Sequence, residues 1–439
     1  MATIKPFRGV RYNPQKIADL STVISQPHDR VRYGLKEKYY DLSPHNVARI
    51  IKGKTYPDDD QTNNTFTRAR DSYRDWQREG VLMREEKPAF YVLQQEFALP
   101  DGTVKKRIGL VAALELSTYD KGIILPHERT LTKSMTERLE LLRATDTNFG
   151  SVFMLYPGSG INELLAPIVK RPPTVEAREM FEHDVIQRFW VVDDPELIEA
   201  ITTVMTPKRR LVIADGHHRY ETALKHREEM CAQYPDAPAN AGFNYRLVTL
   251  VSMEDPGLVI LPTHRMIQSY GQLSTDEILR RAEEYFNVEP VADRQALEDA
   301  MTAIQGEQRP YFGFHNGTSA LVTLRDPRVM AQLLPERSPT WRTLDVAVLH
   351  ELFIERVLGM DKHKVELKEG IEFLRNPEMG YQAVEKNEAA CVLLMRPTRI
   401  EQVQACSAGG ERMPQKSTDF YPKIISGLVA LPVGAEERL

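Results

Sequence analysis

Five consecutive residues, 215–219, gather a carboxylate, two imidazoles and a guanidinium around one glycine. The apolar run 211–214 before them predicts a buried strand, and apolar residues recur at roughly helical spacing over 220–231. The stretch is therefore predicted to be a strand-to-helix turn, where the first free amides of the helix can hold an anion. Arg219 and the histidines would reinforce a bound phosphate, and Gly216 lets the backbone come close to it. The phosphate-binding candidates are Asp215, Gly216, His217, His218 and Arg219.

Two other segments place a histidine beside a carboxylate directly after a proline. His28 and Asp29 are predicted to lie on a turn, because the proline ends an extended segment. His127 and Glu128 lie in a loop before a predicted helix. The segment 412–418 either reaches a phosphate or forms a polar loop over a sheet edge. Side chains that could support phosphate binding are His127, Lys133, Arg138, Arg143, Lys416 and Ser417.

The length of 439 residues and the apolar fraction of 42% are ample for two globular domains, each with its own core. The sequence has no apolar run of membrane-spanning length, and its first residues lack the charged start and apolar core of a secretory signal. We therefore expect a cytoplasmic protein. Cys231, Cys391 and Cys406 show no metal-ligand spacing, so we expect reduced thiols.

Lys and Arg number 57 against 62 Asp and Glu, which gives a net charge of −5. This balance does not favour a nucleic-acid partner. The cations near the candidate phosphate sites would instead serve a small anionic molecule. We therefore expect a small-molecule substrate and no membrane partner. Whether the protein forms a homo-oligomer stays open.

Hydrophobic periodicity predicts alternating helices and strands along the chain. A helix is expected over 65–79, a hairpin over 89–99 and 108–116, and a helix carrying Arg138 and Arg143. A linker is expected over 228–244, and a second set of predicted strands and helices, with a hairpin, follows it. These later elements are strands over 246–251, 258–261 and 391–395, helices over 275–286, 294–304, 345–358 and from about 399, and the hairpin 309–324.

Several common enzyme classes fit the sequence poorly. Ligand types for zinc or manganese are present in 215–218 and 127–128, but no His-Glu-x-x-His occurs and His350 lacks the second histidine. A metal hydrolase is therefore unsupported by spacing. The sequence has no Gly-x-Ser-x-Gly elbow and no glycine pattern typical of phosphate loops or dinucleotide folds.

Phosphoryl transfer fits the residues best. Arg219 and the neighbouring histidines would neutralise the transferring phosphoryl group, while a separate carboxylate takes the proton of an attacking hydroxyl. Magnesium could bridge the phosphates of the donor, with Asp215 or Glu128 as a ligand. The catalytic candidates are Asp29, Glu128 and His218, and the residues alone leave open which carboxylate is the base.

The motif Asp-Gly-His-His-Arg followed by a helix resembles the signature of free-serine kinases in the ParB and sulfiredoxin superfamily. The whole chain resembles the SerK-like domain-of-unknown-function family 1015. Four stretches carry this resemblance over almost the full length. They are residues 5–9 with 12–14, residues 125–130 through 145, the histidine motif, and residues 412–418 with 421–423.

The resemblance implies that residues 215–219 bind the phosphates of donor and product, and that Asp29 is the general base. It also implies L-serine as the leading acceptor. Asp29 and the histidine motif lie far apart in this sequence, so a large insertion must fold around the site. Sulfiredoxins need a cysteine where this chain has His217, so sulfinic acid reduction is not expected.

We therefore predict an α+β protein with a ParB/sulfiredoxin-like core. Residues 1–240 would form the catalytic part, with an insertion over about 55–200, and residues 241–439 an intimately packed C-terminal α/β part. The predicted activity is that of a small-molecule kinase acting on a hydroxyl, with Mg²⁺ and a donor that is ATP, ADP or pyrophosphate. The alternatives are a nucleotide-binding regulatory protein of the ParB type and a metal-dependent phosphohydrolase.

Overall fold

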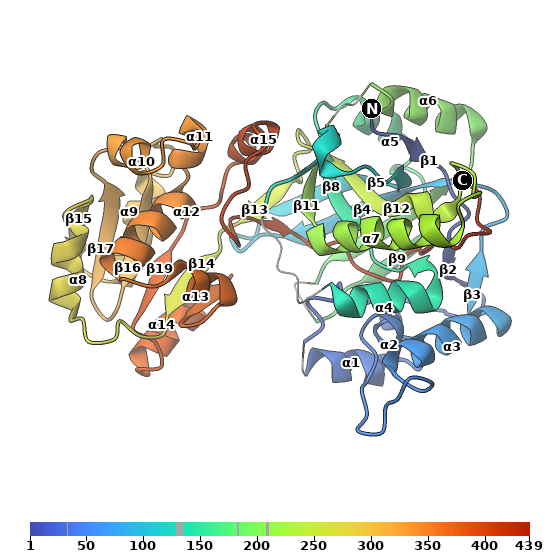
Figure 1. Cartoon of the computed structure of the whole chain (residues 1–439), viewed down its shortest axis with the longest axis horizontal. Helices are drawn as coiled ribbons and strands as arrows, with labels where there is room; N and C mark the ends of the chain where they lie inside the picture. Colours follow the sequence, from blue (N-terminus) through green and yellow to red (C-terminus); the bar gives the residue numbers. More distant parts are fainter. Residues whose placement is uncertain (33, 129–134, 182–183, 208–209) are drawn as a thin grey trace. The chain divides into compact units, whose positions relative to one another are not determined.

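The computed structural model describes residues 1–32, 34–128, 135–181, 184–207 and 210–439, which form two compact units (Figure 1). The first unit contains the described residues up to Pro126, those from 135 to Leu258, and Pro422–Leu439. The second contains His127, Glu128 and Val259–Tyr421.

A mixed sheet forms the centre of the first unit, with nine strands among the described residues. The strand order is β6-β11-β8-β12-β5-β4-β10-β9, and β1 pairs with β5. Strand β11 runs parallel to β6 and antiparallel to β8, so the predicted phosphate motif leaves the sheet between these two neighbours. The strands are β1 (Ile4–Lys5), β4 (Phe90–Ala98), β5 (Val104–Glu115), β6 (Ile124–Pro126), β8 (Val152–Tyr156), β9 (Val175–Arg178), β10 (Ile186–Val192), β11 (Leu211–Asp215) and β12 (Tyr245–Ser252).

Alternate strand residues build the main core. Leu110, Ala112 and Leu114 of β5 point to one face because successive side chains of a strand alternate. They pack in one cluster with residues of α5 (Gly160–Leu165), α6 (Pro195–Met205) and α7 (His217–Gln233). The predicted hairpin is confirmed, since β4 and β5 pair antiparallel.

Further helices stack on α7. Helix α4 (Thr136–Thr145) contacts α7, α3 (Thr65–Arg78) contacts α4, and α2 (Ala48–Ile51) contacts α3, as Figure 1 shows. Helix α1 (Leu35–Leu42) lies against α2. The side chain of Asn64 caps α3. The apolar spacing predicts a face of Phe66, Ala69, Tyr73 and Trp76, of which the last three are buried and Phe66 is half-buried.

The last residues of the chain return to the first unit. Strand β21 (Leu431–Pro432) pairs with β7 (Thr147–Asn148), and Ser426 forms a bridge with Ser25. These contacts bring residues 422–439 beside Ser25 and beside the strand that follows α4. The remaining short elements of this unit are β2 (Val10–Tyr12), β3 (Leu82–Arg84) and the 3-10 turns η1 (Leu20–Thr22), η2 (Tyr119–Lys121) and η4 (Gly242–Asn244).

The first unit extends past residue 240, where the sequence predicts the boundary. Strand β12 lies between β5 and β8 in the central sheet, and the unit continues to Leu258. Every residue of β12 is buried, which is typical of a strand covered on both faces. The first residues of the predicted linker 228–244 belong to α7, which ends at Gln233, and the rest is a loop within the unit that ends in the turn η4.

The second unit contains an antiparallel sheet in the order β15-β17-β16-β19-β14-β18 and a small pair, β13 with β20. The predicted helix 345–358 begins as α12 and continues as a π-helix, η5. The strands are β13 (Val259–Leu261), β14 (His264–Ile267), β15 (Phe286–Val291), β16 (Tyr311–His315), β17 (Ser319–Leu324), β18 (Ile371–Leu374), β19 (Cys391–Leu394) and β20 (Asp419–Tyr421). The helices are α8 (Thr275–Ala282), α9 (Arg294–Ala303), α10 (Arg328–Leu333), α11 (Pro339–Arg342), α12 (Asp345–Val348), η5 (Leu349–Val357), α13 (Lys362–Leu367), α14 (Pro377–Glu385) and α15 (Ile400–Ala408).

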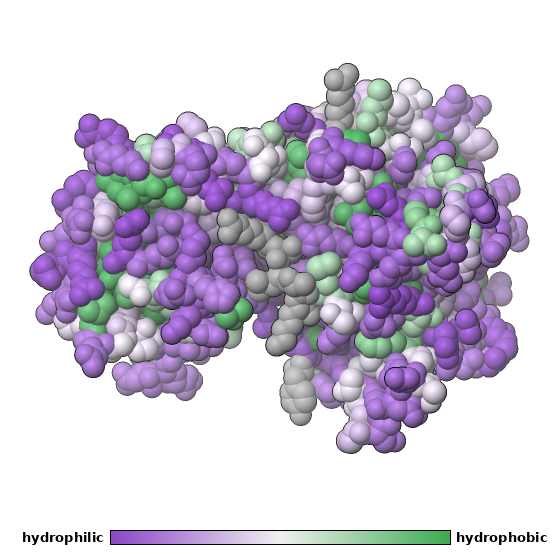
Figure 2. All heavy atoms as spheres, in the orientation of Figure 1, coloured by the Kyte–Doolittle hydropathy of each residue, from purple (hydrophilic) through white to green (hydrophobic). Residues whose placement is uncertain are grey.

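Hydrophilic side chains cover most of the visible surface, and apolar residues are scattered in small groups (Figure 2). Within the described ranges, no helix combines the length and the apolarity needed to cross a bilayer.

Candidate active site

The histidine motif forms the predicted strand-to-helix turn. Strand β11 ends at Asp215, and α7 begins at His217. Gly216 between them has φ of +95°, and an added Cβ would lie 2.8 Å from Nε of Arg219. Glycine is required here for both reasons, because a side chain would strain the backbone and displace the arginine.

Asp215 accepts hydrogen bonds from two cations. Nη2 of Arg219 donates to Oδ2, and Nζ of Lys423 donates to Oδ1 at 3.1 Å. Arg219 also donates through Nη1 to the carbonyl of Ser151, which fixes its guanidinium plane. The side chains of Arg219 and Lys423 are about nine-tenths buried. A helix N-terminus and two buried cations therefore converge at the end of β11.

Asp29 brings a second carboxylate to these cations. Nη2 of Arg138, on α4, lies 3.8 Å from Oδ1 of Asp29. Burial and the charge of Asp215 raise the pKa of Asp29, but Arg219, Arg138 and Lys423 outweigh them and leave it below its ordinary value. Asp29 is therefore ionised at neutral pH although another carboxylate is close by.

His28, beside Asp29, belongs to a different set of contacts. Its Nε2 lies 3.2 Å from Oε2 of Glu137, and Nζ of Lys52 lies 2.8 Å from the same oxygen. Burial lowers the pKa of His28, so the ring is neutral near pH 7. Hydrogen bonds from His28 and Lys52 lower the pKa of Glu137 to about 2. This contact connects the Asp29 turn to the start of α4.

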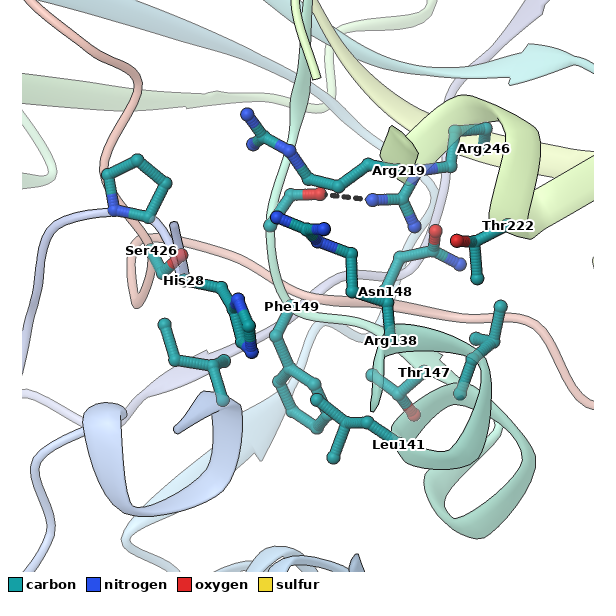
Figure 3. Close-up of a pocket in the computed structure, with 14 residues that line it drawn as sticks. His28, Arg138, Leu141, Thr147, Asn148, Phe149, Arg219, Thr222, Arg246 and Ser426 are labelled. Carbon is teal, nitrogen blue, oxygen red and sulfur yellow. Dashed lines mark hydrogen bonds between the residues drawn. The ribbon is translucent and has the colours of Figure 1, made fainter. Parts of the chain in front are cut away.

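A pocket with a cavity volume of about 70 Å³ opens beside the Arg219 side chain (Figure 3). Three arginines, Arg138, Arg219 and Arg246, line it together with an apolar wall. Figure 3 shows their guanidinium groups gathered at one side of the pocket, with Phe149 and Leu141 at another. The lining residues are Pro27, His28, Ile51, Arg138, Leu141, Leu142, Thr147, Asn148, Phe149, Gly150, Arg219, Thr222, Arg246 and Ser426.

Arg246 was not among the residues selected from the sequence, whereas Lys423 belongs to the stretch 421–423 beside the segment that was expected either to reach a phosphate or to cover a sheet edge. Arg246 is the only charged residue in strand β12, and this is the one sequence signal that marks it. Lys423 lies close in sequence to the predicted segment 412–418, but it contacts Asp215 in the first unit. Lys416 and Ser417 belong to the second unit.

The two histidines of the motif differ in burial. His217 is buried at the first residue of α7, and His218 is half-buried at the second, where its carbonyl accepts a hydrogen bond from Oγ1 of Thr222. Arg143, further along α4, forms surface ion pairs with Glu229 and Glu140. Arg143 therefore has carboxylate partners of its own, whereas Arg138 lines the pocket.

Glu128 and His127 form a cluster within the second unit. Oε1 of Glu128 accepts from the backbone N of Thr418 at 3.3 Å, and Nε2 of His127 lies 2.7 Å from Oγ1 of Thr418. Arg265 is buried nearby and donates to the carbonyl of Lys416. Oγ of Ser417 donates to the carbonyl of Pro414, and Lys416 is exposed. Lys133 lies outside the described residues.

No group of three or more His, Cys, Asp and Glu side chains in the described part of the chain is arranged to hold a metal ion. Mg²⁺ commonly binds through one or two carboxylates plus the phosphates of a substrate. Both oxygens of Asp215 accept hydrogen bonds from Arg219 and Lys423, so a magnesium ion that arrived with a phosphate donor would have to share this carboxylate with the two cations.

Comparison with known families identifies the chain at the family level. The model of a family described as protein of unknown function (DUF1015) matches residues 4–347. The chain belongs to this family. The matched residues contain the strands of the central sheet, Asp29 and the histidine motif, whereas Lys423 lies outside them. No protein of curated function matches the sequence.

Several solved structures resemble this DUF1015 protein at low sequence identity. A conserved hypothetical protein from Pyrococcus furiosus is 13% identical, with a TM-score of 0.35 over 75% of this chain and 97% of that one. A free serine kinase in complex with AMP is 14% identical, with a TM-score of 0.38, and the match covers 75% of this chain and 93% of the kinase chain. SbnI with a C-terminal truncation, from Staphylococcus aureus, is 12% identical, with a TM-score of 0.33, and the match covers 73% of this chain and 87% of the SbnI chain.

Proposed function

We propose that this protein transfers a phosphoryl group from a phosphate donor to the hydroxyl of a small molecule. The observation that supports this most is that two carboxylates, Asp29 and Asp215, lie among Arg138, Arg219 and Lys423 at the start of α7. A phosphoryl-transfer site needs cations around the phosphate and a carboxylate that can take a proton from the acceptor. L-serine is the leading acceptor because of the motif resemblance, and on the same ground we propose a ParB/sulfiredoxin-like core.

The donor phosphates would bind where α7 begins. The free amides of its first turn and the helix dipole favour an anion, and Gly216 leaves room for it. Arg219 and Lys423 would contact the phosphate from their places beside Asp215 and stabilise its charge as the bond to the leaving group breaks. His218, at the second residue of the helix, would donate to the transferring group.

Asp29 would act as the base. Its carboxylate takes the proton of the acceptor hydroxyl while that oxygen forms a bond to the terminal phosphorus of the donor. The bond from this phosphorus to the bridging oxygen breaks, and the leaving phosphate keeps the electron pair. The contacts favour Asp29 over Glu128 for this role, because Asp29 shares its cations with Asp215, whereas Glu128 accepts hydrogen bonds from Thr418.

Mg²⁺ bound with the donor would neutralise charge on its phosphates, and Asp215 is the protein ligand that we propose for it. The protein's own part is to orient the donor through Arg219 and Lys423 and to receive the proton at Asp29.

Phosphorus NMR tests the proposal. The purified protein is incubated with Mg²⁺, L-serine and ATP, ADP or pyrophosphate in turn, and phosphoserine is followed over time. We expect phosphoserine with at least one donor. Donor hydrolysis without phosphoserine would support a phosphohydrolase instead, and nucleotide binding without turnover would support a regulatory protein of the ParB type.

A further inference from the structure

Arg246 is a buried cation that lacks a carboxylate partner among the described residues. The residue is only 5% exposed, and its Nη2 donates to the carbonyl of Gly150 (Figure 3). Its Nε has no hydrogen-bond partner within the described parts of the chain. A buried guanidinium in this state is costly, because its charge has left water without being paired.

The charges around Arg246 increase this cost. Burial and the positive charges of Arg219 and Arg138 lower its pKa to about 9. Arg219 is compensated by Asp215, and Arg138 lies near Asp29. Arg246 thus adds a surplus positive charge to the wall of the pocket, and an anion bound there would remove the repulsion.

Asn148 adds an acceptor to the same pocket. It is 2% exposed, and its Oδ1 has no hydrogen-bond partner among the residues that the structure describes. Its backbone is held by β7, which pairs with β21. A fixed and buried amide oxygen without a donor is also unfavourable, and it would be satisfied by an N–H group of a ligand.

The size of the pocket limits what can bind. A volume of roughly 10–15 Å³ is enough to hold one water molecule, so the cavity of about 70 Å³ has room for roughly five to seven atoms of that size. A free amino acid has this size, and it carries both an anion and an N–H donor. A phosphate group alone would satisfy Arg246 but leave Asn148 without a donor.

From the unpaired donor of Arg246 and the unpaired acceptor of Asn148, we propose that this pocket binds the zwitterionic head of a free α-amino acid. The carboxylate contacts the Arg246 guanidinium, and the ammonium group donates to Oδ1 of Asn148. Arg138 lines the same pocket, and its Nη2 lies 3.8 Å from Oδ1 of Asp29. A short hydroxylated side chain on the bound amino acid would therefore extend toward the proposed base. The role of the bound amino acid as phosphoryl acceptor rests on the proposed function, whereas the binding itself does not.

Calorimetry without a donor tests the binding. L-serine, L-alanine, serinol, which lacks the carboxylate, and hydroxypropionate, which lacks the amine, are titrated into the full-length protein. We expect L-serine and L-alanine to bind, and serinol and hydroxypropionate to bind at least about tenfold more weakly, since each loses one charge-assisted contact. Equal binding of serinol and L-serine would overturn the proposal, as would a lack of L-serine binding by protein that still binds ADP.

Variants locate the contacts. Arg246→Gln and Asn148→Ala are each expected to weaken L-serine binding about 10- to 100-fold, while Arg188→Gln, which removes a half-buried arginine elsewhere on the sheet, leaves it unchanged. Unchanged affinity in both pocket variants would overturn the assignment. If Arg246→Gln lowers the Tm strongly, its affinity is not informative. The ligand comparison on the unmodified protein and the affinity of the Asn148→Ala variant then decide whether this pocket binds the amino acid. L-serine binding that depends on Arg246, without phosphoserine formation, would support this inference and count against the kinase.

Discussion

Nζ of Lys423 lies 3.1 Å from Oδ1 of Asp215, which joins a residue near the end of the chain to the end of strand β11. The neighbouring carbonyls of Pro422 and Lys423 accept hydrogen bonds from Arg107 and Gln95 of the central sheet. The position of this lysine is thus determined by the sheet, and its ammonium group is held where the proposed phosphate cradle needs a cation.

Replacing Lys423 by Gln tests its part in donor binding. The variant should bind the phosphate donor about tenfold more weakly, because one charge-assisted contact to phosphate is lost. The Asp215–Arg219 pair stays in place, so the fold should be retained. Isothermal titration with ADP measures the affinity, and Lys87→Gln serves as a control outside the site. Unchanged affinity in the Lys423 variant would remove this residue from the cradle.

Gly216→Ala should damage both the turn and the site. The backbone angle of +95° strains any side chain, and the new Cβ would push against Arg219. We expect a loss of about 1–2 kcal/mol in the free energy of unfolding, together with weaker donor binding. Gly306→Ala is the matched control, because no atom lies within 4 Å of an added Cβ there. Equal stability of the two variants in urea titrations would contradict the assigned turn.

His218→Ala should lower kcat about 10²- to 10³-fold if this histidine donates to the transferring group. The side chain is half-buried at the start of α7, so the Tm should change little. His363→Ala, on an exposed face of α13, is the control. Full activity of the His218 variant would exclude it from the catalytic set.

The contact of His28 and Lys52 with Glu137 predicts a pH-dependent contribution to stability. The folded-state pKa of Glu137, about 2, lies below its ordinary value. Its contribution is therefore present above the unfolded pKa and is lost as the pH falls through about 2. The Glu137 side chain is more than half exposed, so Glu137→Gln should cost less than about 1 kcal/mol at pH 7. Urea titrations at several pH values should show this difference shrinking between about pH 5 and pH 2; a difference that grows as the pH falls would contradict the assigned contact.

Local signals predicted much of the fold. An apolar run followed by polar residues predicted β11 and the start of α7, and the spacing of Ala69, Tyr73 and Trp76 predicted α3. The mixed α+β architecture with a large sheet follows from the same patterns. The boundary near residue 240 was not predictable locally, because the place of β12 in the central sheet depends on pairing with β5 and β8.

The site was only partly predictable for a similar reason. The motif 215–219, Asp29 and Arg138 carry recognisable chemistry in the sequence, and the structure brings them together. Lys423 reaches Asp215 only because residues 422–439 return to the first unit. Arg246 is the one charged residue of a buried strand, and its surplus charge becomes evident only when Arg138 and Arg219 are seen on the same pocket.

The most direct test of the central claim compares the wild type with Asp29→Asn by phosphorus NMR, under conditions where the wild type converts L-serine and donor into phosphoserine. The amide should lower the rate about 10²- to 10⁴-fold, since it cannot take the hydroxyl proton, while calorimetry shows donor binding retained. Asp75→Asn, in an exposed ion pair with Arg78, should behave like the wild type. Phosphoserine formation at the wild-type rate in Asp29→Asn, or none with any donor in the wild type, would contradict the account.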